Sequence, residues 1–216
     1  ADPGARRDLE QSLAEGISRH VRDVKRRLSR AELVVQVDEP ALPAVLAGEV
    51  PTASGLHRHR AVGGSVAGEV LGWVVDAVVS AGAAPVAHCC AARVPVAVLT
   101  EAGFRALSVD LALISGEQYD EYSRAVDAGV GLWLGAVPAT QPPVSPTDRD
   151  LTARVQRLLD DLGVDAPRPA AGAVVTPACG LAGADPAWAR TALRLARRIA
   201  RNLAGEVSDP GARMSS

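Results

Sequence analysis

The stretch APVAHCCAARVPVAVLTEAGFRALSVDLALI, residues 84–114, decides the predicted fold. Residues 84–90 form an apolar run of strand length, residues 94–102 have the composition of a short helix, and residues 106–114 form a second apolar run. Apolar runs of this length that alternate with helical segments are typical of parallel strands joined by crossover helices. The stretch therefore predicts one β-α-β unit.

The same alternation continues on both sides of this unit. Residues 8–30 are predicted to form a helix, because their apolar residues recur every three or four positions, and residues 33–37 form a short strand after it. A polar, glycine-containing loop is expected up to residue 64. The remaining predicted elements are helices at 66–81, 117–128, 147–162 and 185–203 and strands at 131–137 and 173–177. Five strands, each followed by a helix, indicate an α/β fold with a parallel sheet.

Two α/β architectures contain such units. A doubly wound open sheet usually has a glycine-rich turn after its first strand, whereas the glycines of residues 63–68 follow a long loop. We favour a parallel (β/α) barrel of the TIM type, because candidate functional residues follow several different strands. This barrel is expected to be incomplete, with about five of eight βα units and one leading helix. Residues 1–205 would form this single partial domain, and residues 206–216 a disordered tail.

The composition of the chain excludes several classes of function. Its 216 residues are 48% hydrophobic, and the formal net charge of -2 gives no field that would attract nucleic acid or an anionic membrane. No apolar run approaches the roughly 20 residues of a spanning helix, and the N-terminus has no signal-peptide core. We expect a cytoplasmic protein that binds neither nucleic acid nor membrane. The sequence leaves the oligomeric state open.

Three soft metal ligands follow predicted strands. His88 and Cys90 end one strand and Cys179 follows another, so that two of the three cysteines of the chain belong to this set. A histidine with two cysteines is a donor set that favours zinc. The alternative for each residue alone is a buried core side chain. Cys89 alternates with its neighbours and is expected to face the helices; if the two faces were exchanged, Cys89 would be the ligand.

Two further groups of polar residues lie near the predicted mouth. Asp38 and Glu39 end the first strand, where they either contact a substrate or cap the following turn. His57 and His59 have a metal-like spacing, but an exposed loop favours solvated side chains. The arginines that alternate with them, Arg58 and Arg60, are candidates for contact with an acidic substrate.

Three motifs together carry a resemblance. They are Gln36-Val-Asp-Glu-Pro-Ala-Leu42, the pair His88-x-Cys90, and Thr176-Pro-Ala-Cys-Gly-Leu181. In this order they resemble the C-terminal catalytic barrel of cobalamin-independent methionine synthase, and especially its shorter single-barrel relatives. The resemblance spans about residues 33–203.

The resemblance implies a zinc-dependent methyltransferase of methionine biosynthesis. In that family zinc activates homocysteine as a thiolate, and the methyl group comes from a methyltetrahydrofolate. By position, His88, Cys90 and Cys179 correspond to zinc ligands and Asp38 to the carboxylate that holds the substrate amino group. The implied partners are therefore a small thiol substrate and a methyl donor.

The chain departs from the family pattern at two strand ends. The family has a glutamate ligand after the strand of residues 106–114, and Ser115 is expected in its place. The family also has a histidine after the next strand that acts as an acid and protonates the folate leaving group, whereas residues 131–138 contain no histidine. Two other functions therefore stay open: a non-catalytic or truncated barrel that binds zinc or thiols, and a metal-free enzyme related to uroporphyrinogen decarboxylase.

Overall fold

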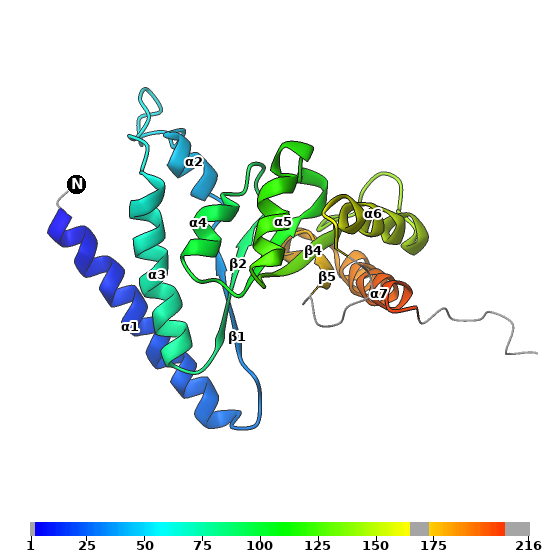
Figure 1. Ribbon diagram of the computed structural model, residues 1–216, viewed down its shortest axis with the longest axis horizontal. Coiled ribbons are helices and arrows are strands. Elements are labelled where there is room, and N and C mark those ends of the chain that lie inside the picture. The colour runs from blue at the N-terminus through cyan, green and yellow to red at the C-terminus, as the bar shows by residue number, and fades with distance from the viewer. Residues whose placement is uncertain (1–2, 165–172, 206–216) are drawn as a thin grey trace, which may run out of the picture.

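A computed structural model describes residues 3–164 and 173–205, and its centre is one parallel sheet (Figure 1). The strand order follows the chain, β1-β2-β3-β4-β5, and every neighbouring pair is parallel. The strands are β1 (Val34–Asp38), β2 (Ala84–Cys89), β3 (Ala106–Asp110), β4 (Gly131–Val137) and β5 (Val174–Pro177). The predicted α/β class, with the strands of an incomplete TIM-type barrel, is confirmed.

Helices precede, connect and follow the strands. They are α1 (Pro3–Arg27), α2 (Leu42–Ala47), α3 (Gly64–Ser80), α4 (Val96–Glu101), α5 (Tyr119–Asp127), α6 (Asp148–Asp161) and α7 (Pro186–Leu203). Side-chain caps fix the start of the last two. Thr147 Oγ1 accepts from the N–H of Asp150 at α6, and Asp185 accepts from the N–H groups of Ala187 and Trp188 at α7. Figure 1 shows α1 beside α3 at one end of the sheet and α6 beside α7 at the other.

The helices and one face of the sheet share a single apolar core. Because β-α-β crossovers are right-handed and the strand order never reverses, all crossover helices lie on the same face. Side chains on that face include Cys89, Leu107, Val109, Leu132 and Leu134, and they join one buried cluster with apolar residues of α3 to α7. The alternate residues of each strand point to the other face, which is the interior side of a barrel.

Three local predictions need correction. The loop predicted up to residue 64 contains the short helix α2, which has a proline in its first turn. Strand β3 ends at Asp110 and not at Ile114, because the chain then turns into the 3-10 helix η1 (Leu111–Leu113). The first helix begins before residue 8. The predicted disordered tail, residues 206–216, lies outside the described residues.

None of the helices among the described residues has the length and hydropathy needed to cross a membrane.

Candidate metal centre

Distant parts of the chain come together where the parallel strands end, at the C-terminal side of the sheet. In the register, Asp38 of β1 lies opposite His88 of β2, and His88 lies opposite Ser108 of β3. These three residues alternate with core residues and therefore point to the interior side. Cys90 directly follows β2, and Cys179 lies two residues beyond the last residue of β5.

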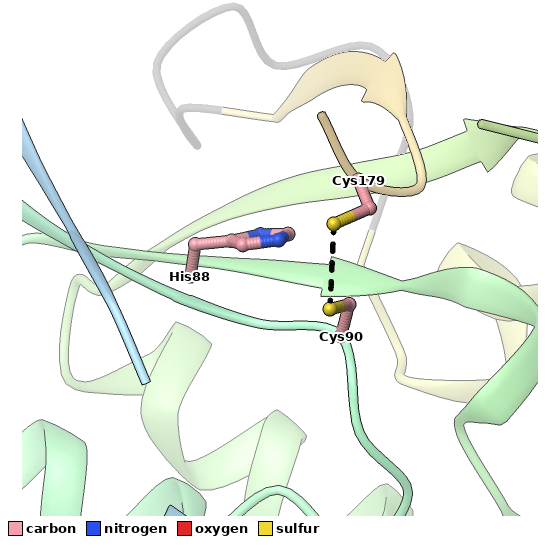
Figure 2. A group of neighbouring side chains, drawn as sticks. All are labelled: His88, Cys90 and Cys179. Carbon is pink, nitrogen blue, oxygen red and sulfur yellow. Dashed lines mark hydrogen bonds between the residues drawn. The ribbon is translucent and has the colours of Figure 1, made fainter. Parts of the chain in front are cut away.

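At the C-terminal side of the sheet, a cluster is formed by His88, Cys90 and Cys179 (Figure 2). One ligand atom of each residue lies within 4.8 Å of those of the other two, and the Cys179 Sγ is 3.5 Å from the Cys90 Sγ. The imidazole is 5% exposed, Cys90 is half-buried and Cys179 is exposed. The structure thus brings together the three residues that the sequence singled out as soft ligands.

The His88 ring has one satisfied and one unsatisfied nitrogen. Its Nδ1 lies 3.1 Å from the Ser108 Oγ, whereas its Nε2 is buried without a hydrogen-bond partner among the described residues. A buried polar atom without a partner costs free energy, on the order of 1–3 kcal/mol. A metal ion bound at Nε2 would remove this cost, because the lone pair would then have a ligand bond.

The Cys90 thiol is protonated at neutral pH when no cation is near. Burial raises the pKa of the Cys90 thiol to about 11, and the hydrogen bond and proximity of Cys179 act in the same direction. A divalent cation inverts this preference, because thiolates are the form that coordinates metals. Binding of a metal at Cys90 would therefore release the proton of this thiol.

Cys89 lies on the opposite side of the strand. It is 1% exposed and belongs to the apolar core, and burial raises the pKa of its thiol. The expectation that Cys90 and not Cys89 faces the site agrees with this placement.

Asp38 and Glu39 lie beside the cluster but do not belong to it. The Asp38 Oδ1 accepts a 2.7 Å hydrogen bond from the Gln36 Nε2, which fixes the direction of the carboxylate. The backbone N–H of Glu39 donates to the carbonyl oxygen of His88 at 2.7 Å, and the Glu39 carboxyl has a raised pKa through burial and the neighbouring Asp38. Of the two, Asp38 is the one on the interior face of the sheet.

Ser115, which the sequence placed at the end of a strand, does not lie there. Ser115 precedes the 3-10 helix η2 (Gly116–Gln118) and is exposed, whereas Asp110 is the last residue of β3. Asp110 shares the interior face with Ser108, and its Oδ1 accepts from the N–H of Ala112 at 2.9 Å. The signal that would have found Asp110 is an acidic residue interrupting the apolar run of residues 106–114.

The histidines of the loop with alternating histidines and arginines do not belong to the cluster. Its four residues at positions 57–60 are exposed, and the Arg58 guanidinium donates to the backbone carbonyl of Glu49 within the same loop at 2.7 Å. The Glu49 carboxylate forms an ion pair of 3.4 Å with Arg93, which follows the cluster along the chain. His57 and His59 do not join a group of metal-ligating residues within the described chain.

Comparison with known proteins decides the family. The model of the catalytic domain of cobalamin-independent synthases matches residues 2–202, which include all five strands and the three clustered residues. The chain belongs to this family. A search of curated proteins finds no match. This cobalamin-independent synthase domain keeps the histidine and the two cysteines together, and its β4 strand ends in Gly135-Ala136-Val137, without an acidic side chain.

Proposed function

We propose that this synthase domain is a zinc-dependent S-methyltransferase that transfers a methyl group from 5-methyltetrahydrofolate to the thiol of homocysteine. The buried, unpartnered Nε2 of His88 beside two thiols carries the proposal. One imidazole nitrogen and two sulfurs fit zinc, and three protein ligands leave a fourth position for a substrate. Bound there, zinc would supply the positive charge that keeps a substrate thiol deprotonated at neutral pH.

The residues of the chain would position the substrate. His88 has little freedom, because its ring is buried and its Nδ1 is held by Ser108. Asp38 lies on the neighbouring strand in register with His88, which supports a role for its carboxylate in accepting the ammonium group of an amino acid whose sulfur reaches the cysteines. The Gln36 side chain holds that carboxylate in place.

In the transfer itself, the bond between the methyl carbon and the donor nitrogen breaks while the bond to sulfur forms. The folate nitrogen then needs a proton, and the side chains at the end of β4 have none to give. We therefore expect transfer from the folate to be slower than from a sulfonium donor, whose leaving group needs no proton. We assign the protein to methionine biosynthesis in the cytoplasm, with small-molecule partners only.

Metal analysis of the purified chain tests the zinc site. We expect one zinc per chain, lost in Cys90→Ser and in Cys179→Ser. Cys89→Ala and Ser115→Ala are matched controls that should keep the metal, because Cys89 lies in the core and Ser115 is exposed beyond the end of β3. Full zinc content in both cysteine-to-serine variants would overturn the site.

An assay for methionine, with homocysteine and either methyl donor, then tests the reaction. Methionine formed only by the zinc-loaded chain supports the methyltransferase. Zinc binding without transfer would favour the non-catalytic barrel that binds thiols. A protein without zinc that binds a porphyrinogen would instead favour the decarboxylase-like function.

A further inference from the structure

The buried pair of His88 and Ser108 has a part in the site beyond packing. The two residues lie opposite each other in the register of β2 and β3, and they are 5% and 4% exposed. Their side chains meet at 3.1 Å between Nδ1 and Oγ. Both strands are central in the sheet, so the backbone holds the two side chains at this separation.

The hydrogen bond determines which nitrogen is free for a metal. A neutral imidazole has one N–H and one lone pair, and only the nitrogen with the lone pair can bind a cation. If Nδ1 donates to the Ser108 Oγ, the lone pair of the ring is on Nε2, and this atom has no hydrogen-bond partner among the described residues. In the other tautomer Nε2 would hold a buried N–H with no acceptor, and Nδ1 would have to accept from the Ser108 hydroxyl, so neither ring nitrogen could bind a metal without a change of tautomer.

We propose that Ser108 is a positioning residue that selects the Nδ1–H tautomer of His88 and thereby prepares Nε2 to bind the metal. The inference rests on the proposed zinc site but concerns the state of the ring before any metal binds. Outer hydrogen bonds to a ligating histidine typically change metal affinity by about 10–100-fold when they are removed. Ser108 itself would not touch the metal or the substrate.

The first test is the tautomer of His88 in the metal-free chain, observed by ¹⁵N NMR of the imidazole nitrogens. A His88→Asn variant identifies the signals among the four histidines. We expect the proton on Nδ1 in the parent chain and a shift toward the Nε2–H form in Ser108→Ala. An Nε2–H ring in the parent chain would overturn the proposal, and this measurement needs no variant of Ser108 that folds.

The second test is metal affinity, measured by competition with a chromophoric chelator for Zn²⁺. We expect Ser108→Ala to weaken binding by about 10–100-fold and Ser108→Thr, which keeps the hydroxyl, to restore both affinity and tautomer. Affinity within twofold of the parent in Ser108→Ala would remove the role. Weak binding by both variants with an unchanged tautomer would reduce Ser108 to a packing residue.

The two tests separate this inference from the proposed function. If the parent chain binds no zinc, the zinc site fails while the tautomer measurement still decides the role of Ser108. If the parent binds zinc and Ser108→Ala binds equally well, only the role of Ser108 fails. Far-UV circular dichroism of each variant shows that its fold is intact.

Discussion

Two buried polar atoms without a hydrogen-bond partner have opposite meanings at the residue scale. The His88 Nε2 lies beside two thiols, so a ligand can satisfy it. The Tyr122 hydroxyl lies in the apolar core, where the side chain is fully buried and the hydroxyl has no hydrogen-bond partner among the described residues. Burial raises the pKa of Tyr122 above its usual value of 10.0. The first atom indicates a site, and the second is a cost to the fold.

Tyr122→Phe should therefore leave the protein as stable as the parent or raise its free energy of unfolding by about 1 kcal/mol, because it removes an unsatisfied hydroxyl and keeps the ring. The difference should grow in alkali. Since the pKa is higher in the folded than in the unfolded chain, the free energy of unfolding of the parent does not change with this titration below about pH 10.0 and falls as the pH rises toward the folded value, whereas Tyr122→Phe has no such loss. Urea unfolding at pH 8 and at pH 11 measures both effects. A large loss of stability at pH 8 would show that the hydroxyl has a partner after all.

Asp38 gives a second prediction at this scale. A charge-assisted hydrogen bond to an ammonium group contributes about 1.5–3 kcal/mol, so Asp38→Asn should weaken homocysteine binding by about 10–100-fold. An alkyl thiol without an amino group is the control, and its binding should not change. Calorimetry on the zinc-loaded chain measures both ligands. An equal loss for both thiols would mean that Asp38 acts on the site and not on the amino group.

At the scale of the element, the sequence predicted most strands and helices, because their apolar periods and caps are local. The run of residues 106–114 shows where such reasoning stops. Leu111 and Leu113 continue the apolar run, but the strand ends at Asp110, whose side chain caps η1. Strand pairing depends on the neighbouring strand and not on the run itself. The three soft ligands were found from the sequence because their residue types are distinctive. Asp110 and Ser108 were not found, because their places depend on the end and the register of β3.

Gly135 of β4 lies in close contact with the backbone of β3 and of the residue that follows β5. A Cβ at this position would lie 2.6 Å from the Cα of Ala178 and 2.7 Å from the carbonyl oxygen of Val109, and Ala178 directly precedes Cys179. Gly135→Ala should lower the free energy of unfolding by about 1–3 kcal/mol, because backbone atoms must move, and should weaken zinc binding through the displaced Cys179. Thermal unfolding and zinc titration measure these losses.

Gly72→Ala in α3 is the matched control for Gly135. An added Cβ meets nothing within 4 Å there, and alanine favours the helix over glycine by about 1 kcal/mol. This variant should be at least as stable as the parent and bind zinc unchanged. Equal behaviour of the two alanine variants would contradict the close approach at Gly135.

At the scale of the whole molecule, the sheet has two edges. Within the described chain β1 pairs only with β2, and β5 pairs only with β4. Val34 on β1 is 50% exposed, and an edge strand with apolar side chains favours pairing with another chain. The number of strands and their parallel arrangement could be predicted from the sequence, but the state of these edges depends on which chains are present.

We expect the isolated chain to associate as its concentration rises, and Val34→Lys to reduce this association, because a charge at an edge opposes strand pairing. Val144→Lys is the control, since Val144 is 82% exposed outside the sheet. Sedimentation velocity over a range of concentrations measures the outcome. A monomer at every concentration, or equal effects of the two lysines, would show that the β1 edge is protected.

The two sulfurs of the cluster belong to residues 89 positions apart in the chain. Each βα unit makes mostly local contacts and can form early, whereas these sulfurs meet only after β5 has docked, so the centre closes late in folding. A bound ion would link the end of β2 to the end of β5 across β3 and β4. Its stabilisation of the native state would grow with the logarithm of the ion concentration. Release of the ion would report the departure of β5 from the sheet, which makes the metal an internal probe of the unfolding rate.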